Sequence, residues 1–249
     1  KKRAEQVAKT KGWALKSVRK DGGFEELMGL TPDGFPLYYA TDNVNAAKST
    51  RANYLNTGGG LGLTLDGQGM VPRVWDGGTV RRSHVAFGGR ITTVDDPSGT
   101  TYASHSTHVA GTIIALPTGI VPASAKGMAT KATARTFEWT NDESEALSEV
   151  ALGMLISNHS YGVPVTNISG VTLPAWYIGA YVDSSKAWDE IAYLSPYYLP
   201  VFSAGNDGLN NNNANPIAAG YDKLVGDKVA KNVLTIASSS DAVINANGS

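Results

Sequence analysis

The chain has 249 residues, a formal net charge of −1, and a composition that is 42% hydrophobic and 17% charged, which excludes an intrinsically disordered protein. No large Lys/Arg cluster follows residue 20, so neither nucleic acid nor an anionic membrane is an expected partner. Cysteine is absent, which excludes disulfides, thiolate metal sites and a cysteine nucleophile, and no apolar run reaches the ~20 residues of a membrane-spanning helix.

Residues 1–55 are predicted to form an N-terminal extension with a helix and a hairpin. The apolar spacing within residues 4–8 indicates a short helix. Residues 24–30 and 37–41 are strand-like runs, and the Thr-Pro-Asp-Gly of residues 31–34 suits a type I turn between them. An antiparallel hairpin is therefore expected here.

Residues 56–70 are glycine-rich and are predicted to be a linker or long loop. Beyond them, residues 71–249 alternate between strand and helix patterns. The expected strands are residues 71–76, 132–139, 156–161, 199–203 and 232–237, and the expected helices are residues 106–115, 140–155 and 183–194. This order predicts an α/β fold with a mostly parallel sheet and helices on both faces. Functional groups in such sheets gather at the carboxyl ends of the strands.

The helix over residues 140–155 has a boundary signal of its own. Thr140 and Glu143 have the spacing of a capping box. Its apolar side chains recur at helical spacing and are expected to face inward, namely Ala146, Leu147, Val150, Ala151, Met154 and Leu155.

Three polar residues stand at predicted strand or helix ends. Asp76 ends a strand before two glycines, where a carboxylate can orient an imidazole; an ordinary turn aspartate is the alternative. His105 directly precedes a predicted helix, whose dipole favours the neutral ring of a general base. A satisfied surface histidine is the alternative, and a metal site with His108 lacks a third ligand. Asn206 follows a strand and can donate to a developing oxyanion, an interaction worth ~3–4 kcal/mol; a simple Asn-Asp-Gly turn is the alternative.

In combination these segments resemble the subtilisin-like serine proteases, over about residues 71–237. The sequence His-Ser-Thr-His-Val-Ala-Gly-Thr of residues 105–112 matches the family's histidine motif, with Ser106 in place of glycine. Trp-Asp-Gly-Gly at 75–78 is similar to its aspartate motif, and Ser-Ala-Gly-Asn at 203–206 to its oxyanion segment. The resemblance implies a subtilisin-like fold in which Asp76 orients His105, His105 is the base and Asn206 supplies the oxyanion donor.

The resemblance also implies a substrate-binding strand. Ser160, Tyr161 and Gly162 correspond to the segment that lines the first specificity pocket and pairs with an extended peptide by strand addition. Tyr161 and its small neighbours suggest a roomy, apolar-tolerant pocket. The expected activity is that of a serine endopeptidase acting on peptides or proteins through an acyl-enzyme, in a secreted or extracellular location.

The family's nucleophile motif, Gly-Thr-Ser-Met-Ala, has no counterpart after Asn206, because the serines at 238–240 and 249 lack its context. Residues 71–249 are therefore expected to form an incomplete catalytic domain that is inactive alone. The serine would come from a C-terminal polypeptide of a nicked enzyme or from a truncated part. The alternative is a non-catalytic pseudoprotease that binds extended peptides.

Two further expectations concern the extension and metals. Residues 1–55 stand where the family often carries a propeptide, although a permanent extension is the preferred interpretation. Asp207, residues 210–213 and Asp222 offer oxygen ligands for a structural calcium ion, but their irregular spacing favours a solvated loop. No cofactor is required and no catalytic metal is expected.

Overall fold

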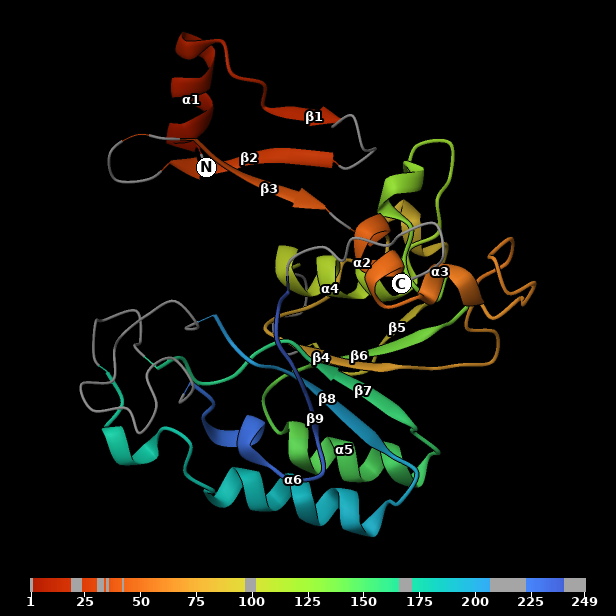
Figure 1. The fold of residues 1–249 in the computed structure, drawn as a ribbon, viewed down its shortest axis with the longest axis vertical. Coiled ribbons are helices and arrows are strands. Elements are labelled where there is room, and N and C mark those ends of the chain that lie inside the picture. The colour runs from red at the N-terminus through yellow and green to blue at the C-terminus, as the bar shows by residue number, and fades with distance from the viewer. Residues whose placement is uncertain are drawn as a thin grey trace.

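Two β-sheets, one antiparallel and one parallel, organise the fold (Figure 1). The computed structural model describes residues 2–18, 24–30, 34, 36–41, 43–96, 102–165, 172–206 and 223–239. The predicted turn at 31–34 lies outside these ranges except for Gly34, as do the proposed calcium ligands.

The N-terminal sheet confirms the predicted helix and hairpin. Its elements are α1 (Lys2–Lys11), β1 (Lys16–Val18), β2 (Phe24–Leu30) and β3 (Pro36–Thr41), with the strands antiparallel in the order β1-β2-β3. Helix α1 is followed by Gly12, which has a left-handed φ of 69°, and the N–H of Trp13 donates to the Ala8 carbonyl at 3.0 Å. Ala4 and Ala8 pack against Leu27. The strand β1 was not predicted.

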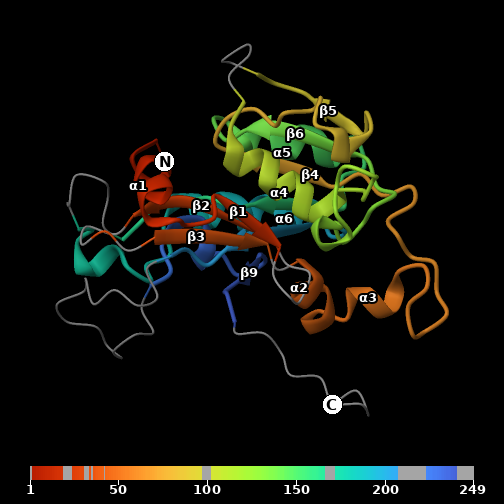
Figure 2. The ribbon, with the colours of Figure 1, turned by 90° about the horizontal axis from the view of Figure 1, so that it is seen from above.

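The connection to the second sheet contains two short helices that the sequence pattern did not predict. They are α2 (Asn43–Ser49) and α3 (Ala52–Leu55), and they lead from the N-terminal sheet toward the parallel one (Figure 2). The glycine-rich residues 56–70 that follow form a loop held in place by side chains. The Asn56 amide donates to the carbonyl oxygens of Leu65 and Met128, at 3.0 and 3.2 Å.

Asp66 fixes the same loop. Its carboxylate accepts hydrogen bonds from the backbone and hydroxyl of Thr57 and pairs with Lys131 Nζ at 3.0 Å. These interactions, led by the Thr57 hydroxyl, lower the pKa of Asp66 to about 2. The loop is thus anchored to the segment that precedes a strand of the parallel sheet.

The second sheet is six-stranded and entirely parallel, in the order β5-β6-β4-β7-β8-β9. Its strands are β4 (Arg73–Asp76), β5 (Ile91–Thr93), β6 (Ala134–Glu138), β7 (Ile156–His159), β8 (Leu199–Ser203) and β9 (Leu234–Ile236). Five of them were predicted, and β5 was not. The crossover helices are α4 (Ser104–Ile114), α5 (Asp142–Ala151) and α6 (Asp183–Leu194), and the short 3₁₀ turns are η1 (Val85–Phe87), η2 (Ala123–Ala125), η3 (Ala175–Tyr177) and η4 (Gly226–Val229).

Helices cover both faces of this sheet, as predicted. Helix α4 lies on one face, on the side of the N-terminal sheet, and α5 and α6 lie on the other (Figure 1). Aromatic side chains fill the layer beneath α5 and α6. Trp75 is fully buried and stacks on Phe137 at 4.3 Å and on His159 at 5.2 Å, while Trp188 of α6 packs edge-on against Phe202. The predicted α/β class with a mostly parallel sheet is confirmed.

The start of α5 differs from its prediction. Thr140 donates both its N–H and its hydroxyl to the Glu138 carboxylate, and Asn141 occupies the N-cap position with φ 77° and no side-chain capping bond. The predicted capping box is therefore wrong, because a closer acceptor takes the threonine hydroxyl. Leu147 and Leu155, predicted to face inward, are about half exposed at 45% and 50%.

A buried glutamate takes the inward position on α5. Glu149 accepts from Arg73 Nε at 2.8 Å and from Arg135 Nε and Nη2 at 2.9 and 2.7 Å. The two arginines are in-register neighbours on β4 and β6. Burial alone would raise the pKa of Glu149, but the hydrogen bonds and charges of both arginines outweigh it and lower that pKa. The carboxylate thereby neutralises two adjacent cations. None of the helices in the described ranges is long and apolar enough to cross a membrane.

Candidate active site

Asp76 ends β4 at the carboxyl edge of the parallel sheet. The strand runs between β6 and β7 and is buried along its whole length, so the carboxylate is only 2% exposed. The backbone N–H of Gly77 donates to Oδ1 at 2.8 Å. An acidic side chain is thus held rigidly at the position where functional groups collect in such sheets.

The first turn of α4 is fastened to the segment that follows Asp76. The Ala103 N–H donates to the Thr79 carbonyl at 2.9 Å, and Thr79 and Tyr102 form a parallel bridge. One turn into the helix, the Thr107 hydroxyl accepts the Arg81 N–H at 2.9 Å. These bonds fix where the helix begins relative to the end of β4.

This attachment brings His105 onto Asp76. His105 is the second residue of α4 rather than the residue before it, because the helix begins two residues earlier than predicted, and its Nδ1 lies 2.7 Å from Asp76 Oδ1. Since a carboxylate only accepts, Nδ1 carries the proton and the lone pair stands on Nε2. The imidazole is 63% exposed while the carboxylate is buried. That tautomer leaves Nε2 as the basic nitrogen, as a general base requires.

Burial affects the pKa of the Asp76 carboxyl group. Removal from water raises the pKa of its carboxyl group, and the hydrogen bond and charge of His105, with the Gly77 N–H, oppose that rise. A desolvated carboxylate interacts more strongly with a cation beside it than a solvated one does. Asp76 is therefore suited to stabilise His105 when the imidazole takes up a proton.

Gly78 sets the spacing between the two catalytic candidates. Its φ is 87°, and a Cβ there would lie 3.0 Å from the Ala103 Cβ, at the start of α4. We expect Gly78→Ala to push this turn away and to lower kcat of the active enzyme by about 10- to 100-fold, because misplacement by ~1 Å can cost 10².

The matched control for that variant is Gly89→Ala. Gly89 also has a left-handed φ, 77°, but a Cβ there meets nothing within 4 Å. Backbone strain is thus common to both variants, and only Gly78→Ala displaces α4. Steady-state kinetics on a peptide substrate measures the difference, and equal loss in the two variants would refute the positioning role.

The remaining predicted site residues follow the next two strands of the same edge. Ser160, Tyr161 and Gly162 come directly after β7, and Asn206 lies three residues beyond the end of β8. Because β4, β7 and β8 are consecutive and parallel, all of these positions share one edge of the sheet. Asn206 is exposed, and the Ala204 N–H before it is held by the Ile236 carbonyl at 2.8 Å.

Tyr161 directs its side chain into the protein. Its hydroxyl donates to Asp142 Oδ2 at 2.5 Å, and it packs against the aromatic layer under α5 and α6. Its ring therefore cannot widen a pocket for substrate, and only its backbone remains available for strand addition. The Ser160 hydroxyl is also engaged, accepting from the Asn158 amide at 2.8 Å. The predicted backbone role of this strand stays a prediction.

A directed chain of hydrogen bonds supports the segment that follows β7. Because Tyr161 donates to Asp142, it accepts from His159 Nδ1–H at 2.8 Å, so His159 Nε2 accepts from Ser157 at 2.7 Å. Ser157 in turn accepts from Tyr198 at 2.6 Å. Complete burial lowers the pKa of His159 to about 3, which keeps it neutral. The chain holds the segment after β7 in place.

Trp139 lies beside Asp76 and was not singled out by the sequence analysis. It directly follows β6, its N–H donates to the Asp76 carbonyl at 3.1 Å, and it is 48% exposed. Its ring lies over Gly77, where a Cβ would come within 2.8 Å, and meets Tyr161 edge-on at 5.5 Å. The sequence did offer a signal for Trp139, because it is an aromatic residue directly after a predicted strand.

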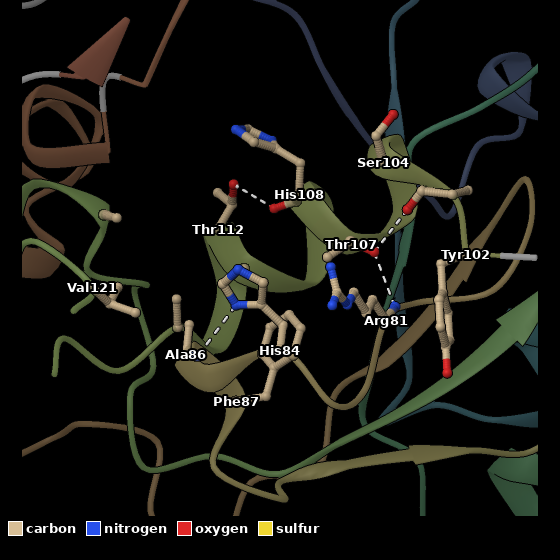
Figure 3. A pocket seen from close by; sticks show the side chains of 14 residues that line it. Arg81, His84, Ala86, Phe87, Tyr102, Ser104, Thr107, His108, Thr112 and Val121 are labelled. Atoms are coloured by element: carbon tan, nitrogen blue, oxygen red, sulfur yellow. Dashed lines mark hydrogen bonds between the residues drawn. The ribbon is translucent and has the colours of Figure 1, made fainter. Parts of the chain in front are cut away.

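A separate cavity of about 600 Å³ lies on another face of α4 (Figure 3). Its rim carries Arg81, His84 and His108, and Phe87 lies in its wall. His108 lines this cavity. Within the ranges that the structure describes, no group of three or more His, Asp or Glu is placed to hold a metal ion.

Residues 73–247 match the model of the subtilase family. The chain belongs to this family. Its six-stranded parallel sheet with helices on both faces agrees with the subtilisin-like class predicted from the sequence. A comparison with curated protein sequences gives no match.

Several solved subtilase-like structures are similar to part of the chain. The self-cleaved protease domain of PatA is 23% identical with a TM-score of 0.42, and the match covers 58% of this chain and 52% of that one. A cold adapted subtilisin-like serine proteinase is 22% identical (TM-score 0.36; 58% and 49% covered). The Clostridium perfringens CspB protease is 19% identical (TM-score 0.44; 64% and 41% covered). The chain thus spans about half or less of the length of these subtilases.

Proposed function

We propose that this chain contributes the base and the oxyanion donor of a serine endopeptidase whose nucleophilic serine lies outside these 249 residues. The observation that carries the proposal is the 2.7 Å hydrogen bond from His105 Nδ1 to the buried Asp76, which leaves Nε2 basic at the carboxyl edge of the sheet. The proposal is supported by family membership over residues 73–247.

The reaction proceeds in two transfers of an acyl group. The serine oxygen attacks the peptide carbonyl carbon while His105 Nε2 takes the serine proton, and Asp76 stabilises the resulting imidazolium. The Asn206 amide donates to the carbonyl oxygen as it gains charge. His105 then gives the proton to the leaving amine, which frees the first product. Water repeats the sequence on the acyl-enzyme and releases the second.

The substrate in this proposal is an extended peptide or protein segment. It pairs with the backbone of Ser160, Tyr161 and Gly162, so main-chain hydrogen bonds supply affinity. The enzyme acts outside the cell, as family membership suggests, and needs no cofactor, with calcium at most a structural ion. Its partner is the C-terminal polypeptide or segment that carries the serine.

Fluorophosphonate labelling of the full-length protein tests this function. We expect one serine to react, in a peptide outside residues 1–249, as read from the intact and peptide masses. Labelling should disappear after addition of a general serine-protease inhibitor. A protein that binds extended peptides but takes up no label would instead be a pseudoprotease.

A further inference from the structure

The segment directly after β7 is not held by backbone hydrogen bonds. The pairing of β7 with β8 ends at His159. Within the part of the chain that the structure describes, no hydrogen bond joins the backbone of Tyr161 or Gly162 to another backbone group. Gly162 is exposed and has a left-handed φ of 148°. The peptide groups of these two residues are therefore available to a bound peptide, and side chains must keep them in place.

Tyr161 is the side chain that fastens this segment to its surroundings. Its hydroxyl donates to Asp142 Oδ2 at 2.5 Å, at the first residue of α5, and accepts from His159 Nδ1 at 2.8 Å. Its ring meets those of Trp139 and His159 edge-on, at 5.5 and 5.6 Å. One hydroxyl thus ties the segment both to helix α5 and to the last residue of β7.

His159 connects that hydroxyl to the strands that carry the other proposed site residues. The imidazole is fully buried and lies nearly parallel to Trp75 and Phe202, with ring centroids 5.2 and 4.4 Å away and interplanar angles of 9° and 12°. Trp75 directly precedes Asp76 on β4. Phe202, on β8, lies four residues before Asn206. A ring packed on both faces cannot tilt, so its Nδ1 is a donor with a fixed position.

We propose that Tyr161 and His159 are positioning residues, which set the affinity for the peptide substrate by holding the backbone of residues 160–162 ready for strand addition. The inference rests on the proposed function, in which this backbone pairs with the substrate. A segment that is already ordered does not have to be ordered when the peptide binds. Fixing the backbone of one residue changes an equilibrium by about 5- to 30-fold, so loosening this segment should weaken binding by a similar factor.

The effect of such loosening should fall on KM rather than on kcat. Asp76 and His105 are held together by other contacts, namely the Gly77 N–H at the carboxylate and the attachment of α4 to the Thr79 carbonyl. None of these contacts involves the Tyr161 hydroxyl. A change that removes only substrate binding raises KM and leaves kcat unchanged.

Tyr161→Phe and Tyr198→Phe form a matched pair for the test. Both tyrosines belong to the same aromatic layer, and each variant removes one hydroxyl from the same chain of hydrogen bonds. Tyr198 stands at the other end of that chain, where it donates to Ser157 at 2.6 Å, so its loss leaves the bonds of Tyr161 intact. Urea denaturation should therefore show similar losses of stability in the two variants.

Their kinetics should differ. With fluorescein-labelled casein as the substrate of the full-length protein, we expect Tyr161→Phe to raise KM about 5- to 30-fold while kcat stays within about two-fold. Tyr198→Phe should leave both constants near their wild-type values. An equal rise of KM in the two variants, or an unchanged KM in Tyr161→Phe, overturns the inference and leaves the endopeptidase standing.

A failure of the proposed function is recognised separately. If casein is not hydrolysed, fluorescence anisotropy measures the binding of a fluorescein-labelled casein peptide to the same proteins. Binding that is weakened by Tyr161→Phe alone then supports the inference without the catalytic activity. Equal binding by the wild type and both variants refutes it.

The wild-type protein allows a measurement that does not depend on the folding of a variant. Because Tyr161 donates to Asp142, His159 carries its proton on Nδ1. Nitrogen NMR of the histidine rings should show a neutral, Nδ1-protonated ring whose signals stay constant from neutral pH into mild acid, since burial lowers the pKa of His159 to about 3. Protonation of this ring on Nε2 would reverse the hydrogen bond to Tyr161 and overturn the inference.

Discussion

Replacing His105 with alanine is expected to lower kcat/KM of the serine-containing enzyme by about 10⁴- to 10⁶-fold, with little change in KM. The imidazole is the group whose Nε2 is left basic by the 2.7 Å bond from Nδ1 to Asp76. Without it the serine has no acceptor for its proton, and the leaving amine has no donor. Substrate binding depends on other residues, so the loss should fall on kcat.

His108→Ala is the matched control for that experiment. His108 lies one turn further along α4 and lines the separate cavity, and among the described residues its ring has no hydrogen bond. Activity of this variant should stay within a few-fold of the wild type. Peptide hydrolysis is followed under single-turnover and steady-state conditions, with circular dichroism as a check of folding. Near-normal turnover in His105→Ala would contradict the assignment of the base.

The sequence was sufficient to locate Asp76 and His105 because both stand in local motifs. The strand before Asp76 is a short apolar run, and the residues after His105 repeat at helical spacing, so each side chain could be placed at the end of an element. Helix α6 was predicted over its full length for the same reason. Hydrophobic periodicity is a property of the local sequence, and each of these elements is long enough, at four or more residues, to show it.

Short or edge elements escaped this reasoning. Strand β5 has three residues and helix α3 has four, too few for any period to emerge. The start of α5 was misread because the Thr140 hydroxyl has an acceptor in Glu138, two residues back, that competes with the helix backbone. A capping motif is ambiguous in the sequence when its hydroxyl has two possible hydrogen-bond partners nearby.

The positions of other side chains depend on contacts between segments that are distant in the sequence. Lys228 belongs to no motif, and its contact with Gly162 and Gly205, which follow two different strands, is visible only in the folded structure. In the sequence Trp139 is only the end of a predicted strand, and the structure is needed to show that its ring lies over Gly77. A glutamate on a helix is normally solvent-facing, and only the arginines of β4 and β6 explain why Glu149 is buried. Such contacts are part of the tertiary structure and cannot be inferred from the spacing of residues in the sequence.

Glu149→Gln is expected to lower the free energy of unfolding at neutral pH by about 3–5 kcal/mol, the cost of breaking a buried ion pair. The glutamine amide cannot neutralise Arg73 and Arg135, which stand side by side in register, with the Arg73 side chain only 8% exposed. Urea denaturation gives the difference. Glu190→Gln is the matched control, because its pair with Lys186 is 3.4 Å long and exposed on both sides, and such pairs contribute at most ~0.5 kcal/mol.

The pH dependence of the same variant distinguishes charge from packing. The pKa of Glu149 is lowered in the folded protein, so its stabilisation is complete above its ordinary value of 4.5 and is lost as the pH falls through the folded pKa. The difference between wild type and Glu149→Gln should therefore shrink in acid, since both then carry a neutral side chain between two cations. A difference that stays constant from neutral pH into acid would show that the shape of the glutamate, rather than its charge, holds β4 and β6 together.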